Sequence, residues 1–136
     1  MGRQVAWLAK QVEAGLAEVD LSVPQYRLLA ALADAPEAPS NLACRLGVRP
    51  PSVTALVDGL VGRGLVSRRP QTGDRRRVSH DLTDAGRSAL ALADRATEQR
   101  LQALVAGLPA GRAAAAFDGL TAWGEAMLLA RRGVGR

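Results

Sequence analysis

Cysteine, lysine and aromatic residues are scarce in this sequence. Cys44 is the only cysteine among 136 residues, so no intramolecular disulfide can form, and the composition fits a reducing compartment. One cysteine and one histidine cannot build a zinc site of the usual kind. Neither a secretory signal nor an apolar run approaching about 18 residues is visible. We therefore expect no metal site, no membrane association and a cytoplasmic location.

Sequence patterns that carry catalysis are missing as well. The chain has no glycine-rich phosphate-binding loop, no cluster of metal ligands and no nucleophile–base pair. We therefore expect neither enzymatic activity nor a cofactor. Binding functions are the classes that remain.

What the chain does have is apolar and basic residues. Hydrophobic residues make up 48% of it, and they are mostly alanine and leucine, which favour helices over strands. The formal net charge is +5, and every basic residue except Lys10 is an arginine. Because the guanidinium fork fits phosphate and guanine edges, this favours a nucleic acid or another polyanion as partner over a charge that serves only solubility.

Apolar periodicity and turn residues predict a mostly helical chain with one β-hairpin. Helices are predicted over 3–20, 24–33, 41–46, 50–63 and 84–108, with a last helix after the break at 109–111, and strands at 65–69 and 78–82. Ser40 and Thr83 are expected to cap helices, and Gly47 and Gly64 to end them. The first and last helices carry apolar faces that so short a chain cannot easily bury alone, which predicts a second subunit.

Residues 42–66 have the pattern of a helix-turn-helix. Ala43 is small where the two helices would cross, and Gly47 allows the positive φ of the turn. The inward face of the second helix would hold Val53, Leu56, Val57 and Leu60, so Ser52, Thr54, Ala55 and Asp58 would lie outside. The hairpin that follows directly predicts a winged variant, with a strongly basic tip at 70–77.

At this point the sequence resembles the MarR family of transcription regulators. The resemblance covers about residues 40–86 and rests on Leu42-Ala43, Leu46-Gly47-Val48, Ser52 to Leu60, Gly64-Leu65-Val66, Asp74-Arg75-Arg76, Leu82-Thr83 and Gly86. The flanking helices match in order and length rather than in residues. The implied fold is mainly α with a small β-hairpin wing, a winged helix-turn-helix with N- and C-terminal dimerisation helices.

The resemblance also implies a function and a division of the chain. Residues 1–22 and 84–136 would form the dimerisation helices, and residues 24–83 the winged helix. A homodimer would bind an inverted repeat in double-stranded DNA, with each recognition helix in a major groove and each wing in the neighbouring minor groove. Many such regulators repress transcription and release DNA when a small phenolic or other aromatic ligand binds.

The recognition helix supplies the first group of candidate DNA contacts. Residues at the N-terminal end of such a helix face base edges, which selects Arg49, Pro50, Pro51, Ser52, Thr54 and Ala55. Ser40 and Asn41 begin the preceding helix and are candidate phosphate contacts, because helix N-termini favour anions. The pattern departs from the family at Ala55, where an arginine is frequent, at the two prolines, and at Gly59 and Gly62 inside the helix.

The wing supplies the second group. Arg68, Arg69, Arg75 and Arg77 are candidate phosphate contacts. By the resemblance, Arg76 is the arginine that enters the minor groove, and Asp74 is the acid that steadies it through a charged hydrogen bond.

Two alternative functions remain open for the whole chain. It could be an architectural DNA-binding protein with little sequence preference, or a winged helix that contacts another protein.

Several remaining residues have two interpretations. Cys44 is expected to be a buried structural cysteine, with redox sensing as the alternative. His80 lies on the second wing strand and is expected at the surface, facing solvent or phosphate. Trp7, Tyr26, Phe117 and Trp123 are expected in the core or the dimer interface, with a ligand pocket as the alternative.

Overall fold

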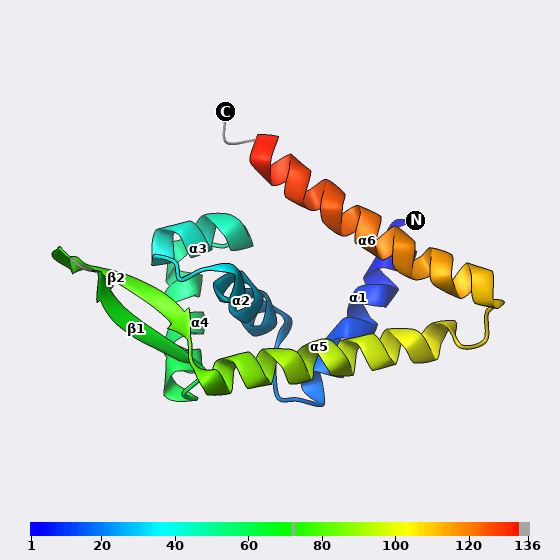
Figure 1. Ribbon diagram of the computed structural model, residues 1–136, viewed down its shortest axis with the longest axis horizontal. Helices are drawn as coiled ribbons and strands as arrows, with labels where there is room; N and C mark the ends of the chain where they lie inside the picture. The colour runs from blue at the N-terminus through cyan, green and yellow to red at the C-terminus, as the bar shows by residue number, and fades with distance from the viewer. Residues whose placement is uncertain (72, 134–136) are drawn as a thin grey trace. The chain divides into compact units, whose positions relative to one another are not determined.

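The part of the chain that the structure describes is mainly helical, with six helices and a two-stranded antiparallel wing (Figure 1). The computed structural model describes residues 1–71 and 73–133, and the side chains of these except at 71, 74–77, 132 and 133. The elements are α1 (Gly2–Ala17), α2 (Val23–Asp34), α3 (Pro39–Leu46), α4 (Pro50–Gly62), β1 (Val66–Gln71), β2 (Asp74–Leu82), α5 (Asp84–Val105) and α6 (Ala110–Gly133). The predicted fold class is therefore confirmed.

The chain divides into two compact units, Met1–Arg100 and Leu101–Arg136. The core of the first unit gathers leucines, valines and alanines from helices α1 to α4, the wing root and α5. Its fully buried side chains include Leu28 and Leu42 from the helices before the turn, and Val53 and Leu60 from the helix after it. Because α4 is held through these residues, its opposite face stays available for a partner.

Two glycines make the turns that set the angle of the recognition helix. Gly47 ends α3 with φ 64°, and Gly64 follows α4 with φ 73°, both in the left-handed region that glycine adopts without steric cost. At the second turn the amide of Leu65 donates to the carbonyl of Leu60 at 2.9 Å. Both glycines were predicted to end their helices, and both do.

Thr83 and Gly86 join the wing to α5. The Thr83 hydroxyl donates to the carbonyl of Gly64 at 2.6 Å and accepts from the amide of Gly86 at 2.9 Å, which confirms its predicted capping role. A Cβ on Gly86 would run into the carbonyl oxygen of Leu65 and lie 3.3 Å from Leu82. Only glycine therefore allows α5 to start this close to the end of α4.

A hydrogen bond between side chains ties α2 to α5. The Tyr26 hydroxyl donates to Asp94 Oδ1 at 2.6 Å. Burial, together with this carboxylate, raises the pKa of the Tyr26 phenol from 10.0 to about 12. Tyr26 is half-buried beside the core, which is one of the two positions predicted for it.

The wing is longer than predicted and has a third partner at its base. β1 and β2 pair from Val66↔Leu82 to Pro70↔Val78, with a register shift between Pro70 and Gln71. Most of the basic segment therefore belongs to strands rather than to a turn. An isolated antiparallel bridge joins Glu37, in the loop between α2 and α3, to His80 in β2.

Other predictions also differ from the structure, at two helix ends and in the burial of one residue. Ser40 does not cap α3, because Pro39 occupies the first turn, where a fixed φ favours helix, and Ala38 becomes the N-cap. α5 ends at Val105 rather than 108. Cys44 is exposed rather than buried, because it lies on the face of α3 opposite to Leu42 and Leu46.

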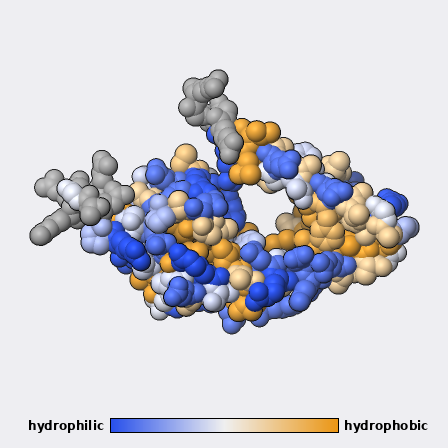
Figure 2. Space-filling view, viewed as in Figure 1, coloured by the Kyte–Doolittle hydropathy of each residue, from blue (hydrophilic) through white to orange (hydrophobic). Residues whose placement is uncertain are grey.

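The second unit consists of the end of α5 and the helix α6. Its large apolar side chains remain exposed in the chain taken alone, as Figure 2 shows along α6. These exposed residues are Leu104, Leu108, Leu120, Trp123, Met127, Leu128 and Leu129. None of the helices in the described part of the chain is both long and apolar enough to cross a membrane.

Candidate nucleic-acid interface

The exposed face of α4 is the centre of the candidate interface. Val53, Val57 and Leu60 are buried, and Leu56 is half-buried. On the opposite face, all of the residues predicted to read DNA are exposed, namely Arg49, Pro50, Pro51, Ser52, Thr54 and Ala55. Each of these side chains is small or rigid except that of Arg49. The face can therefore approach a groove closely, with one long cation at its start.

Backbone geometry at the start of α4 explains the two prolines. Arg49 is the N-cap with extended backbone (φ −71°, ψ 145°), which is the conformation favoured before proline. Its carbonyl accepts from the amides of Ser52 at 2.9 Å and Val53 at 3.3 Å. Because Pro50 and Pro51 have no amide hydrogen, two of the donors that a helix start leaves unsatisfied are removed.

The Thr54 hydroxyl already has a hydrogen-bond partner inside α4, which limits how it can contact DNA. Its hydroxyl lies 3.3 Å from the carbonyl oxygen of Pro50, one turn earlier in the same helix. When the hydroxyl donates there, its oxygen retains accepting capacity. Ser52 is exposed and free of such a bond among the interactions of the described residues, so it is the more versatile of the two.

The start of α3 presents the predicted phosphate-facing residues. Ser40 and Asn41 are exposed in the first turn of the helix. The backbone amides of Asn41 and Leu42 already donate to the carbonyl of Ala38 at 3.1 Å. The side chains, rather than those two amides, are therefore available for an anion.

At the root of the wing, Arg68 is already engaged. Its Nη2 forms a close ion pair with Asp58 Oδ1 on α4, and both side chains remain partly exposed. The pair links the first wing strand to the outer face of α4. Arg68 therefore orients the wing in the chain alone, in addition to the phosphate contact predicted for it.

The other wing-root arginine has a weaker partner. Arg69 Nη2 lies 3.9 Å from Asp81 Oδ2, and Arg87 Nη2 on α5 lies 3.7 Å from Asp81 Oδ1. The Arg69 side chain is 70% exposed, so such an ion pair contributes little to stability. Arg69 remains accessible to a phosphate.

His80 is buried, with only 4% of its surface exposed, so the prediction of a surface position is wrong. Burial lowers the pKa of its imidazole from 6.5, a shift that Arg68 reinforces. It shares a face of β2 with Val78 and Leu82, and this face lies against the helices. Apolar neighbours at the alternate positions Val78 and Leu82 were the sequence signal that could have placed His80 on this face.

A small pocket lies between α4 and the wing root. It has a volume of about 210 Å³, and its lining residues are Pro39, Thr54, Val57, Arg68, Val78 and His80. The lining thus combines three apolar residues with one cation, one hydroxyl and one imidazole. The residues come from α3, α4 and both strands, so anything bound there touches the elements that would hold DNA.

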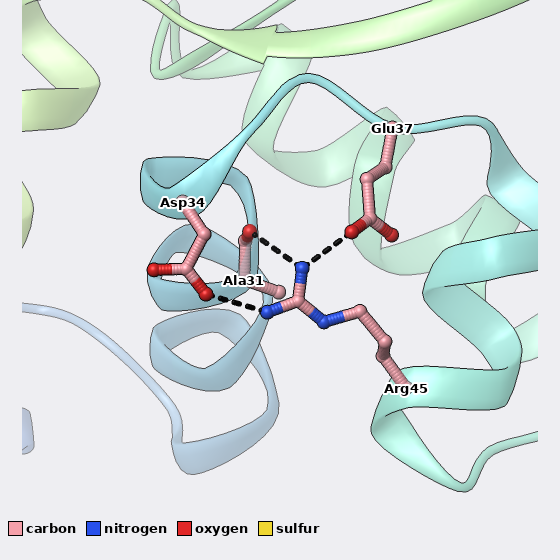
Figure 3. A network of polar contacts seen from close by, with 4 residues as sticks. All are labelled: Ala31, Asp34, Glu37 and Arg45. Atoms are coloured by element: carbon pink, nitrogen blue, oxygen red, sulfur yellow. Dashed lines mark hydrogen bonds and ion pairs between the residues drawn. The ribbon is translucent and has the colours of Figure 1, made fainter. Parts of the chain in front are cut away.

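A network of polar contacts surrounds Arg45 in the last turn of α3 (Figure 3). Its Nη1 donates to the carbonyl of Ala31 at 3.2 Å and pairs with Glu37 Oε1, while Nη2 lies 2.6 Å from Asp34 Oδ2. The two carboxylates raise the pKa of this guanidinium further. Sequence reasoning missed this network, because its members lie on separate elements and none of them belongs to a motif.

Near the tip of the wing, the structure describes the backbone but not the side chains of residues 74–77. Asp74, Arg75, Arg76 and Arg77 belong to β2 by their backbone. The predicted minor-groove role of Arg76, the support from Asp74 and the phosphate contacts of Arg75 and Arg77 stay predictions.

The four aromatic residues are divided between the two compact units, with Trp7 and Tyr26 in the first and Phe117 and Trp123 in the second. Trp7 and Trp123 are 78% and 65% exposed, Phe117 is half-buried, and Tyr26 packs beside the core. Among these described side chains none lines the pocket at the wing root. Trp7 and Trp123 are therefore not core residues of the chain taken alone, and their predicted place in a dimer interface stays a prediction.

Comparison with known proteins identifies the family whose members this chain resembles. Residues 21–78 match the model of the MarR family. The chain is 40% identical over 73 residues to the HTH-type transcriptional repressor YetL of Bacillus subtilis (strain 168), an alignment covering 52% of this chain and 44% of that protein. It is 33% identical over 95 residues to an uncharacterized HTH-type transcriptional regulator of Mycobacterium leprae (strain TN), covering 69% and 66% respectively. The matched parts thus span 44% of the first relative and 66% of the second.

Solved structures agree over a larger share of the chain. The crystal structure of RV1404 from Mycobacterium tuberculosis has a TM-score of 0.80 at 28% identity, covering 91% of this chain and 86% of that one. The transcriptional repressor CouR, bound to a 23-mer DNA duplex, has a TM-score of 0.73 at 29% identity, covering 89% and 86%. Both curated relatives carry the names of transcription regulators, and neither is named as an enzyme.

Proposed function

Because the chain belongs to the MarR family, we propose that it is a cytoplasmic transcription repressor that binds an inverted repeat in double-stranded DNA as a homodimer. The observation that carries this proposal is the division of α4 into two faces. Val53, Val57 and Leu60 fix the helix in the core, while the six predicted base-reading positions lie open to solvent beside the wing. The relative CouR, which matches this chain over most of its length, is bound to a DNA duplex.

The roles within this interface follow from chemistry. Arg49 would bind a guanine edge or a phosphate, and Ser52 and Thr54 would hydrogen-bond to bases or backbone. Pro51 and Ala55 offer apolar contact to a thymine methyl group. The arginines of the wing, including Arg76 at its tip, would contact phosphates and the minor groove.

The homodimer is supported by apolar surface that the chain does not bury alone. Trp123, Met127, Leu128 and Leu129 are all more than half exposed on α6, and Trp7 is exposed on α1. Exposed apolar patches of this kind mark interaction surfaces. A two-fold dimer through the terminal helices would cover them, and would place two recognition helices at half-sites about one helical turn apart.

A small aromatic acid is the ligand class that suits the pocket between α4 and the wing root. Its volume of about 210 Å³ fits a single ring, since an apolar cavity of about 150 Å³ accepts benzene. Arg68 would pair with the acid, while Val57 and Val78 would contact the ring. Such a ligand would compete with the Arg68–Asp58 ion pair and loosen the wing, releasing DNA.

The experiment that tests the function is a selection of fragmented source-genome DNA on the purified protein at physiological salt. Two variants accompany the parent, namely Arg76→Ala at the wing tip and Arg95→Ala, which removes an equal charge from an exposed position on α5. We expect the parent and Arg95→Ala to recover a few fragments that share a short palindrome. Arg76→Ala should recover little.

Two other outcomes would each favour an alternative function. DNA recovered without sequence preference, and with a steep salt dependence, would indicate an architectural protein. Recovery of no DNA by the parent, with or without dialysis to remove a small ligand, would indicate a winged helix that contacts another protein.

A further inference from the structure

The contacts of Arg45 form a chain of interactions that runs from α2 to the wing. Its Nη1 donates to the carbonyl of Ala31, one of the last four carbonyls of α2, which have no partner inside the helix. Its Nη2 lies 2.6 Å from Asp34 Oδ2 at the end of α2. A cation at this place also interacts favourably with the helix dipole. Arg45 therefore anchors α3 to the end of α2.

The same guanidinium holds Glu37 in the following loop. Figure 3 shows Arg45 between the carboxylates of Asp34 and Glu37, with Ala31 beside them. The side chains of Arg45 and Glu37 are only 30% and 16% exposed. A charge-assisted pair at this depth is stronger than a surface ion pair.

Glu37 in turn pairs with the wing through its backbone. Its amide donates to the carbonyl of His80 at 3.1 Å, and its carbonyl accepts from the amide of His80 at 2.8 Å. The prolines on either side favour this extended conformation, because Ala35 and Ala38 precede proline and have ψ of 151° and 153°. The loop thereby acts as a third, one-residue strand at the wing root.

His80 completes the connection to the recognition helix. Its buried side chain lines the same small pocket as Thr54 and Val57 of α4. A two-stranded ribbon is only marginally stable alone, so its direction depends on what holds its base. Here the base is held by Glu37 on one edge of β2 and by the Arg68–Asp58 pair on β1.

We propose that Arg45 and Glu37 are positioning residues, which fix the direction of the wing relative to α4 and so determine whether the wing reaches the minor groove. This inference rests on the proposed function, since it assigns a role in DNA binding to residues that do not face DNA. Lysine cannot replace Arg45, because the site uses two nitrogens of a planar fork to reach three acceptors.

The test compares Arg45→Met and Glu37→Gln with a matched control, Arg27→Met. Arg27 also joins α2 to α3, through a 2.9 Å hydrogen bond from Nη2 to the carbonyl of Leu46, but among the described residues it forms no hydrogen bond or ion pair with the loop or the wing. Hydroxyl-radical protection of the selected DNA fragment measures minor-groove contact, and protection of guanine N7 from methylation measures major-groove contact.

We expect Arg45→Met to lose minor-groove protection outside the recognition-helix sites while major-groove protection remains. Its affinity should fall about tenfold, the scale of one charged hydrogen bond. On an Arg76→Ala background, the same substitution should change affinity little, because the wing contact is already lost. Arg27→Met should lower stability without separating the two kinds of protection.

Parallel loss of both protections in Arg45→Met, or an unchanged footprint, would overturn the positioning role while leaving the proposed function intact. Failure of the parent to bind DNA would instead overturn the proposed function. Hydrogen exchange at the amide of His80 provides a readout without DNA. The exchange should accelerate in Arg45→Met and Glu37→Gln but not in Arg27→Met, and equal exchange in all would reject the connection itself.

Discussion

At the scale of residues, the most informative positions are titratable groups that folding removes from water. Tyr26 donates to Asp94 across the junction of α2 and α5, and His80 is enclosed between the wing and α4. Neither group belongs to the sequence motif. Both report on packing that the proposed DNA-binding activity requires, and each can be observed individually because the chain has one tyrosine and one histidine.

Tyr26 should titrate far above the normal range for a phenol. Because it is the only tyrosine, the rise in absorbance at the phenolate band follows this residue alone. We expect a midpoint near the pKa of about 12 in the folded protein. The midpoint should be about 10 in urea. Asp94→Asn should lower the folded midpoint, and a folded parent that titrates near 10 would contradict the hydrogen bond.

His80 should lower the free energy of unfolding of the parent as the pH falls. Its folded pKa lies below the ordinary 6.5, so the unfolded state binds more protons as the pH falls through that value. The free energy of unfolding of the parent, minus that of His80→Gln, should be constant above about pH 7.5 and fall below 6.5. Urea unfolding at several pH values measures it.

The groups that face His80 define the control for that measurement. They are Arg68 on β1, Asp58 on α4 and the backbone of Glu37 in the loop. Arg68→Met should reduce the lowering of the His80 pKa, because one neighbouring cation is removed. Parallel curves for the parent and His80→Gln across pH 5 to 8 would show that the imidazole is not buried in solution.

At the scale of elements, the junction of α4, the wing and α5 depends on one glycine. Gly86→Ala should destabilise the protein by several kcal/mol, because the added Cβ meets backbone at Leu65 that cannot move independently. Gly59→Ala is the matched change. It lies on the exposed face of α4 with nothing within 4 Å, and should stabilise by up to about 1 kcal/mol.

Chemical denaturation distinguishes the two substitutions without reference to DNA. The prediction fails if the midpoints of Gly86→Ala and Gly59→Ala shift equally, or if Gly86→Ala retains the stability of the parent. A large loss for Gly59→Ala would show instead that α4 is strained at this point.

Local signals allowed much of the fold to be predicted from the sequence. Gly47 and Gly64 end helices through their positive φ, and Thr83 caps the start of α5, each at the predicted position. The spacing of apolar residues identified the inner face of α4. Ser40 was misassigned because Pro39 starts the helix earlier, which the serine signal does not reveal. The start of β2 and the end of α5 were also missed, since helix and strand ends depend on tertiary context.

The candidate site was predicted as a set of exposed residues but not as a connected structure. The exposed face of α4 agrees with prediction, whereas the Arg68–Asp58 and Arg45–Glu37 pairs do not follow from periodicity. The Glu37–His80 bridge depends on how a loop meets a strand more than 40 residues away. Contacts of this kind are set by the register of the hairpin and by loop geometry, neither of which a single sequence specifies.

At the scale of the whole molecule, the proposed function requires a second copy of the chain. The apolar side chains of α6 are exposed in the chain alone, and covering them would supply most of the driving force for a dimer. Truncation before Ala113 should therefore abolish dimerisation and lower solubility, as measured by sedimentation.

A milder variant separates association from folding. Met127→Lys with Leu128→Lys places two charges on α6 and changes no residue of the core of the first unit. We expect a shift toward monomer with the helical content retained, and a large loss of affinity for a two-half-site duplex. A variant that stayed dimeric would show that the exposed apolar residues of α6 do not form the interface.

Sequence-specific DNA binding by this chain can be measured by an equilibrium competition at physiological salt. A duplex that carries the selected palindrome competes with one of equal length and composition in which the palindrome is scrambled. A specific regulator should prefer the palindrome by about 1,000-fold or more. This preference should be retained in Arg95→Ala and should collapse in Arg76→Ala. Equal affinity of the parent for the two duplexes would show that the chain is not a sequence-specific regulator.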